Sequence, residues 1–356
     1  MYSKAIIQAP IIFFFGAGAS RPLGKLLMGE FIGLLENSIG LKGDVLFSRI
    51  IAQERDLEFL LGELEEWNSK SYYPPRQLLW GSPTGPVPNQ FEEQLGGLTA
   101  RAGELYQIVR REVFSAYRNI QNKELIPSLC LPLFESAFHV LQPLHHPLVV
   151  FTTNYDPVVE ELCEGAADRY DLIDGFFHDA ASKSYIWRRA EFDRYQRPES
   201  KKNVVLCKLH GSTSWTKTPK GIIRSAASIY TTDDKSHQNV LIYPAKKKVA
   251  TEEPFFTAYD YFQRSMEGCK LCITIGYSFR DEDALTRLRS ASSLNTDLKV
   301  IVVDPNAREI CTKKLAPLGI RTEAIVARFG DQTEQAQYIQ AIRDHLSMAV
   351  GTLNSQ

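Results

Sequence analysis

The sequence predicts an α/β protein with a Rossmann-like, doubly wound parallel sheet and a large helical insertion. Three observations support this prediction. Short runs of β-branched and aromatic residues recur, each followed by Gly, Asn or Asp and then by a helix-like pattern. Nearly all of these runs are continuously apolar, as strands covered on both faces are. Between the first two runs lie about 130 residues, far more than a crossover helix needs.

The apolar runs define the expected strands. All but residues 240–243, which look exposed, are nearly continuously apolar, as central strands should be. A further strand is expected near residues 320–328, followed by a final helix. The expected strands are residues 11–15, 148–153, 204–209, 240–243, 271–276 and 300–304.

The long segment after the first strand is expected to be mainly helical. Apolar residues at helical spacing predict helices over residues 56–67, 91–117 and 129–141, and the turn-rich residues 72–88 predict a loop. Residues 165–202 are charged and aromatic and are expected to be irregular, either a lid or a surface excursion. We therefore predict a core of residues 1–40 and 145–356, with an inserted helical subdomain of residues 41–144.

Composition excludes several classes of protein. Among 356 residues, 44% are hydrophobic and 23% are charged, which excludes disordered and fibrous chains. No apolar stretch reaches the roughly 18 residues that span a bilayer. Because 41 basic residues balance 42 acidic ones, we expect no direct nucleic-acid binding, and the basic stretches 188–197 and 246–248 are predicted to be solvated loops. The six cysteines lie in apolar segments, as buried thiols of a cytoplasmic protein do.

The first candidate site is the turn directly after the first strand. Residues 16–20 read Gly-Ala-Gly-Ala-Ser, and glycine lets backbone N–H groups approach a phosphate beside a helix N-terminus. A tight strand-to-helix turn needs the same glycines without any ligand. No Gly-Lys-Ser or Gly-Lys-Thr follows, so the turn is not a Walker A loop and nucleoside triphosphate chemistry is disfavoured.

Polar residues also follow the second and third strands, where open α/β sheets bind ligands. Asn154 is a candidate ligand contact, whereas Asp156 with Pro157 forms a good N-cap pair for the helix that follows. His210 is suited to move a proton near neutral pH, although a lone histidine at a strand end is often only structural. The convergence of these strand ends favours a functional site.

Two further strand ends complete the pattern. Gly276 and Ser278 allow close backbone approach to a nucleotide, and Asp304 is the type of strand-end acid that binds a ribose diol. Each position has a structural alternative. Asp281 can cap the next helix, and Asp304 with Pro305 can be only a turn.

The order of these motifs resembles that of the sirtuin, or silent information regulator, superfamily. The resemblance runs from about residue 11 to about residue 305. It implies that the first loop holds the NAD pyrophosphate, that Asn154 and His210 are catalytic beside the nicotinamide ribose, and that the later motifs hold the adenosine half. The implied NAD-binding residues are Gly16, Ala17, Gly18, Ala19, Ser20, Thr153, Asp156, Gly276, Ser278 and Asp304.

The chain departs from the protein-deacylating sirtuins in two respects. Their zinc ribbon uses two Cys-x-x-Cys pairs, whereas only Cys269 and Cys272 have this spacing here. Residues three apart on a strand point to opposite faces, so we expect buried thiols and no metal. The Gly-Ile-Pro-Asp-Phe-Arg segment that follows the first loop in deacylases is also absent.

With these departures, the chain resembles bacterial sirtuin-like NAD hydrolases of anti-phage defence. The resemblance implies a homo-oligomer that cleaves NAD to ADP-ribose and nicotinamide and depletes the cell of NAD. It also implies gating by oligomerisation or by a partner, either a HerA-type ATPase or an Argonaute-like protein. Three alternatives stay open: a non-catalytic NAD or ADP-ribose sensor or scaffold, a nucleic-acid-associated module that uses the basic stretches 188–197 and 246–248, and a protein deacylase.

Overall fold

The computed structural model describes residues 9–68, 89–180, 183–196, 202–225, 230–231, 238–243 and 252–353. The chain forms two compact units. One, the sheet unit, comprises Met1–Lys25, Tyr117–Leu241 and Val249–Gln356, and the other, the helical unit, comprises Leu26–Ala116 and Ile242–Lys248. These bounds differ from the expected core and insertion, because residues 26–40 and 242–248 join the helical unit and residues 117–144 join the sheet unit.

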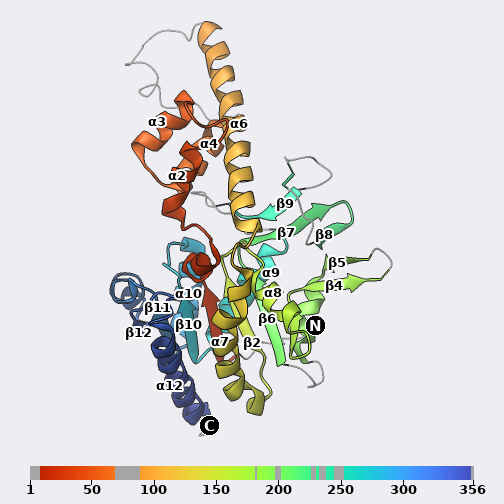
Figure 1. The fold of residues 1–356 in the computed structure, drawn as a ribbon, viewed down its shortest axis with the longest axis vertical. Coiled ribbons are helices and arrows are strands. Elements are labelled where there is room, and N and C mark those ends of the chain that lie inside the picture. The colour runs from red at the N-terminus through yellow and green to blue at the C-terminus, as the bar shows by residue number, and fades with distance from the viewer. Residues whose placement is uncertain are drawn as a thin grey trace. The chain divides into compact units, whose positions relative to one another are not determined.

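The sheet unit contains a seven-stranded sheet in the order β12-β11-β10-β1-β2-β6-β3 (Figure 1). Every neighbouring pair in it is parallel, so the predicted doubly wound α/β fold is confirmed. Because β1 lies between β10 and β2, the strand order reverses beside it, which is where such sheets bind ligands. The strands are β1 (Ile11–Phe15), β2 (Leu148–Thr152), β3 (Tyr170–Ile173), β6 (Lys202–Lys208), β10 (Leu271–Ile275), β11 (Lys299–Val303) and β12 (Arg321–Ile325).

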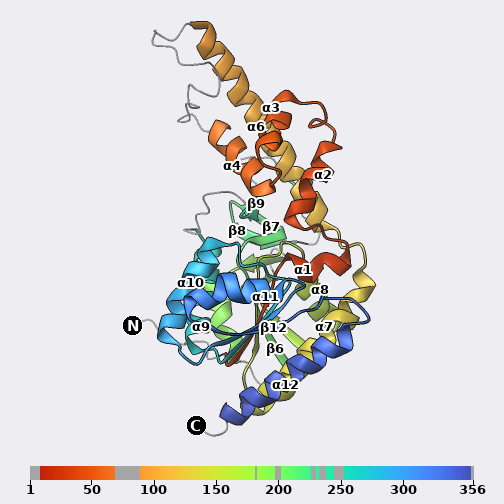
Figure 2. The ribbon, with the colours of Figure 1, turned by 90° about the vertical axis from the view of Figure 1, so that its left-hand side faces the viewer.

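Helices cover both faces of this sheet (Figure 2). Alternate side chains of β1 point to opposite faces. On one face the Phe13 ring lies 6.4 Å from the Phe134 ring of α7, and on the other the Phe14 ring lies 5.5 Å from the Phe262 ring of α9. Burial on both faces explains the continuous apolar runs. The helices are α7 (Ile126–Leu141), α8 (Val158–Gly165) and α12 (Gln335–Leu353) on the first face, and α9 (Phe255–Gly268) and α10 (Glu282–Leu294) on the second.

One helical stretch is apolar enough to cross a membrane, contrary to the sequence expectation. Lys123–Leu144 spans 22 residues and passes this test by length and composition alone. The core helix of a globular fold passes the same test, and 56% of the apolar window is buried here. Leu133 and Phe138 of α7 belong to the main hydrophobic core, so packing against the sheet accounts for the apolar sequence.

A second sheet, five-stranded and antiparallel, was not predicted. Its order is β4-β5-β8-β7-β9. Of the run at 240–243, expected in the parallel sheet, only residues 240 and 241 form a strand, and they belong to β9, which pairs with β7. The region 165–202, expected to be irregular, supplies β3, β4 and β5. The strands are β4 (Phe176–Asp179), β5 (Ser184–Trp187), β7 (Gly211–Thr218), β8 (Gly221–Arg224) and β9 (Gln238–Leu241).

The helical unit contains two of the three helices predicted after the first strand, and the third, at 129–141, is α7 of the sheet unit. Asp44 caps α3 by accepting a hydrogen bond from Phe47 N at 2.9 Å. The predicted loop at 72–88 and the basic run at 246–248 lie outside the described residues. The helices are α2 (Phe31–Glu36), α3 (Val45–Gln53), α4 (Leu57–Asn68) and α6 (Asn89–Arg118). Short segments elsewhere are α1 (Ala17–Ser20), η1 (Arg21–Leu23), η2 (Met28–Glu30), η3 (Lys123–Leu125), η4 (Gln142–Leu144), η5 (Arg189–Gln196), α11 (Ala307–Ile310), η6 (Cys311–Leu315) and η7 (Ala316–Leu318).

Candidate functional site

The backbones after β1 and β10 approach each other closely at the carboxyl edge of the parallel sheet. Gly16 N donates to Ile275 O at 3.0 Å, and Gly18 N donates to Gly276 O at 2.9 Å. Gly276 has a φ of +61°, and a Cβ there would lie 2.4 Å from Ala19 N. A Cβ on Gly18 would lie 2.7 Å from Gly276 Cα. Any side chain at these glycines would therefore push the two loops apart.

These contacts explain the glycine pattern without a ligand. The N–H groups of Gly16 and Gly18 already donate to carbonyl oxygens and are not available to a phosphate in this arrangement. Ala17 and Gly18 lie half-buried at the start of α1, whereas Ala19 and Ser20 are buried. The predicted pyrophosphate role of this loop stays a prediction.

Asn154 ties the loop after β2 to the loop after β1. Its Nδ2 donates to Gly16 O at 2.8 Å and to Ser20 Oγ at 2.9 Å, and its backbone N donates to Thr152 Oγ1 at 2.9 Å. A carbonyl oxygen only accepts, so the bond to Gly16 identifies the amide nitrogen. Asn154 Oδ1 is left as an acceptor. The neighbouring Thr153 is half-buried, and its N lies 3.4 Å from Phe15 O.

Asp156 lies at a small buried cavity below these loops. The cavity has a volume of about 20 Å³, enough for one water molecule, and its polar lining includes Ser20, Asn154 and Lys208. Asp156 Oδ1 accepts a long hydrogen bond of 3.4 Å from Val158 N, and its Oδ2 has no partner. The N-cap residue of α8 is Pro157, so Asp156, the predicted N-cap, lies one residue before the observed one and makes only a weak capping hydrogen bond.

A buried ion pair beside this cavity was missed in the sequence. Lys208 Nζ lies 3.2 Å from Glu160 Oε1 and also donates to the backbone oxygen of Asp156. Both side chains are at most 5% exposed. The sequence signal for this ion pair was a lysine at the end of an otherwise apolar strand, because a buried amine needs an acidic or polar partner.

His210 lies between β6 and β7, where the chain passes from the parallel to the antiparallel sheet. Leu209 N donates to Thr152 O at 2.8 Å, which places this turn beside the end of β2. His210 is buried, with its ring centroid 6.3 Å from that of Tyr155. Gly211 has a φ of +81°, and a Cβ there would lie 2.1 Å from Val240 O, so the turn requires glycine.

The imidazole of His210 contacts a carboxylate through Nε2, which pairs with Asp281 Oδ2. Asp281 also caps α10 as predicted, because its Oδ1 accepts from Asp283 N at 3.0 Å and Ala284 N at 3.1 Å. Tyr259 Oη donates to Asp281 Oδ2 at 3.3 Å. Burial, reinforced by the charge of Asp281, raises the pKa of Tyr259, so the phenol stays a donor. Only the capping role of Asp281 was expected from the sequence.

Ser278 and Asp304 follow β10 and β11 at the same edge of the sheet. Ser278 is exposed. Asp304 Oδ1 accepts from Asn306 N at 2.8 Å, so the turn that was its structural alternative is present. Burial raises the pKa of Asp304, and the bond from Asn306 opposes this shift.

The contacts described above join some of the candidate residues into two groups, and Ala17, Thr153, Asp156, Ser278 and Asp304 belong to neither. The loop cluster contains Gly16, Gly18, Ala19, Ser20, Asn154 and Gly276. The histidine cluster contains His210, Asp281 and Tyr259.

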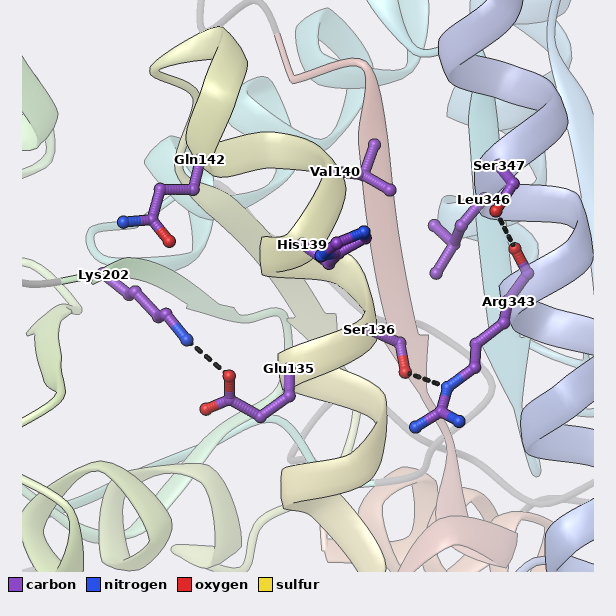
Figure 3. Close-up of a pocket in the computed structure, with 9 residues that line it drawn as sticks. All are labelled: Glu135, Ser136, His139, Val140, Gln142, Lys202, Arg343, Leu346 and Ser347. Carbon is purple, nitrogen blue, oxygen red and sulfur yellow. Dashed lines mark hydrogen bonds and ion pairs between the residues drawn. The ribbon is translucent and has the colours of Figure 1, made fainter.

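A larger pocket lies at the opposite edge of the sheet, between α7 and α12 near the start of β6 (Figure 3). It has a volume of about 530 Å³, and four of its polar side chains bond to one another in two pairs. Lys202 pairs with Glu135, and Arg343 Nε donates to Ser136 Oγ at 2.9 Å. None of the predicted site residues lines this pocket, because their strands end at the other edge of the sheet.

The described residues contain no group of three or more His, Cys, Asp or Glu side chains that could hold a metal ion. Cys269 and Cys272 are both buried, as predicted. Burial raises the pKa of Cys272 to about 12, so this thiol is protonated near neutral pH and is a poor ligand.

A model of a known protein family matches the segment that contains most of these residues. A family model described as the SIR2-like domain matches residues 148–322. This segment is similar to the SIR2-like domain. The SIR2-like segment includes Asn154, His210, Asp281 and Asp304, but the loop at 16–20 precedes it. The match supports the sirtuin-like superfamily proposed from the order of motifs.

The solved structures that match this chain include several Sir2 homologues. A mutant in complex with ADP-ribose is 13% identical, with a TM-score of 0.43 over 98% of both chains. A second mutant complex with ADP-ribose is 14% identical, with the same TM-score and coverage. A Sir2 homologue in complex with NAD is 12% identical, with a TM-score of 0.43 over 96% of this chain and 90% of that chain. No curated protein sequence matches this chain significantly.

Proposed function

We propose that this chain binds NAD at the carboxyl edge of its parallel sheet and hydrolyses the bond between nicotinamide and ribose. The histidine cluster carries the proposal. A buried imidazole held by a carboxylate lies at the edge where doubly wound sheets bind ligands. The SIR2-like match over residues 148–322 supports NAD as the substrate.

The adenosine half of NAD would lie toward β10 and β11. Asp304 can accept hydrogen bonds from ribose hydroxyls. Because Asn154 Nδ2 is held by Gly16 and Ser20, Asn154 Oδ1 is oriented to accept from a water molecule or a ribose hydroxyl.

The reaction needs little covalent help from the protein. Nicotinamide leaves as a neutral molecule from a cationic ring, and its nitrogen keeps the electron pair of the broken bond. Water attacks the anomeric carbon, and the transition state resembles an oxocarbenium ion, so positioning and polarity supply most of the catalysis. Asn154 orients the water and His210 accepts its proton, which gives ADP-ribose, nicotinamide and one proton.

The first test is chromatographic measurement of NAD consumption and nicotinamide release by wild type, His210→Ala and Asn154→Ala. We expect each variant to lose about a hundredfold or more of the turnover, the scale of a positioned acid–base group. His139→Ala is the matched control, because this exposed histidine lines the pocket at the opposite edge.

The alternatives predict different outcomes of this test. Binding of NAD without consumption by wild type and variants alike would favour a sensor or scaffold. Nicotinamide release that depends on an acylated peptide would identify a deacylase. Absence of NAD binding under all conditions would refute the proposal.

We further propose that the activity depletes NAD in anti-phage defence and is gated by self-assembly or by a partner. A HerA-type ATPase is the preferred partner and an Argonaute-like protein the alternative, both from the family resemblance. Exposed apolar side chains in the helical unit support an interaction surface: Leu34, Ile39 and Val45 are 39%, 93% and 65% exposed. Replacement of all three residues by serine should abolish self-assembly or co-purification with the ATPase. Size-exclusion chromatography with light scattering measures the mass of the assembly in each case.

A further inference from the structure

A single carboxylate connects three separate segments at the histidine cluster. Asp281 Oδ1 is held by two backbone N–H groups of α10, and Oδ2 is shared by His210 Nε2 and Tyr259 Oη. We propose that Asp281 is the positioning residue that sets the orientation and tautomer of His210. This inference rests on the proposed function, because it concerns the same histidine.

The geometry allows the carboxylate little freedom. Two hydrogen bonds from the backbone of α10 fix Oδ1, and the positive end of this 13-residue helix favours a negative charge there. Oδ2 is therefore presented in one direction. Asp281 is 6% exposed and Tyr259 is 0% exposed, so water does not compete effectively for this oxygen.

The chemistry of the partners decides where the imidazole proton lies. Two backbone N–H groups and a phenol donate to Asp281, so this carboxylate is an acceptor of hydrogen bonds. His210 Nε2 must then carry a proton. In the neutral imidazole, Nδ1 is left without one and becomes the atom that accepts the proton of the attacking water.

Substitution by asparagine separates this role from helix capping. Asparagine caps a helix as well as aspartate does, so Asp281→Asn keeps the contacts of Oδ1 with α10. The amide can present an N–H group to His210 Nε2, which disfavours the Nε2–H tautomer. Asp56 is the matched control: it caps α4 through Oδ1, which accepts from Glu58 N at 2.8 Å and Phe59 N at 3.2 Å.

The experiment records ¹⁵N imidazole spectra of histidine-labelled protein, with His210→Gln to assign the signals. We expect the Nε2–H tautomer in wild type and Asp56→Asn, and a shift toward Nδ1–H in Asp281→Asn. NAD turnover should fall by about a hundredfold in Asp281→Asn, with NAD affinity within about threefold of wild type, and Tyr259→Phe should lose only a few-fold.

The spectra test the positioning role of Asp281, and the turnover measurement tests the proposed function. An Nδ1–H tautomer in wild type, or an unchanged tautomer in folded Asp281→Asn, would overturn the inference. If Asp281→Asn does not fold, the wild-type tautomer still decides. If wild type consumes no NAD yet shows the Nε2–H tautomer and its loss in Asp281→Asn, the proposed function fails while the positioning role stands.

Discussion

The two sheets of the sheet unit place polar residues in different ways. Strands β1, β2 and β10 are buried along their whole length, so polar residues are found mainly beyond their carboxyl ends. Strands β4, β5 and β8 are half-buried or exposed throughout and carry polar residues at many positions. The polar residues that follow a strand buried on both faces therefore stand out in the sequence as candidate site residues. Those of a half-exposed strand do not.

The links between the two sheets include a crossing of the chain and an ion pair. The chain itself crosses from β6 to β7 at His210 and Gly211. The second link is an ion pair between Asp174, which follows β3, and Arg224 of β8.

The largest effect is expected from alanine at a glycine of the parallel sheet. Gly276→Ala should lower the free energy of unfolding by roughly 3 kcal/mol or more. The added Cβ disfavours the positive φ of this residue and also collides with the backbone at Ala19 N. We expect Gly211→Ala to cost less, because its added Cβ meets Val240 of β9, an edge strand with a neighbouring strand on one side only. Urea denaturation measures both.

Gly319→Ala is the control for backbone conformation alone. Gly319 has a φ of +71° with no atom near the added Cβ, so we expect a loss of only about 1 kcal/mol. If Gly211→Ala proves more harmful than Gly276→Ala, the antiparallel sheet is the less adaptable of the two.

The next effect concerns pH and the link between the sheets. Burial raises the pKa of Asp174 to about 6, and the opposing charge of Arg224 does not cancel this. The folded state thus binds the proton of Asp174 more tightly than the unfolded state does. The stability that this proton contributes to the folded state is fully present below about pH 4 and is lost as the pH rises through about 6. Relative to wild type, Asp174→Asn should gain up to about 3 kcal/mol between pH 4 and pH 7.

Denaturation of both proteins across this pH range checks the sign. Asp297→Asn is a control of opposite sign, because the hydrogen bond from Lys270 lowers the pKa of this exposed carboxylate. Its effect should be small, since exposed ion pairs are screened by water. A constant difference between Asp174→Asn and wild type would mean that Asp174 does not titrate in this range.

The smallest effect is expected at Asp304. Asparagine keeps the turn through its side-chain oxygen but removes the charge that would bind ribose hydroxyls. We expect the Kd for NAD to rise by up to about tenfold with unchanged thermal stability. Asp331→Asn is the matched control, because Asp331 makes an equivalent turn by accepting from Thr333 N at 2.9 Å. Calorimetry that shows equal affinity for both variants would remove Asp304 from the proposed site.

The contrast between the sheets also explains what the sequence could predict. The strands at 11–15 and 271–276 were predicted within one residue, because burial on both faces leaves a continuous apolar run. The segment Tyr170–Ile173 was missed because Asp171 interrupts its apolar run and charged residues flank it. The contact between His210 and Asp281 joins residues 71 apart, and no local pattern encodes such a pairing. The candidate catalytic and NAD-binding roles stay predictions that the experiments above address.

The burial of every native thiol has a practical consequence. All six cysteines are buried, and burial raises the pKa of Cys130 and of Cys272 to about 12. Maleimide dyes react with accessible thiolates, so the native chain should stay unlabelled under mild conditions. Ile39→Cys, at a position 93% exposed, then creates one selective attachment point for a fluorophore on the helical unit. A change in its emission on mixing with a candidate partner would report association without removal of any native cysteine.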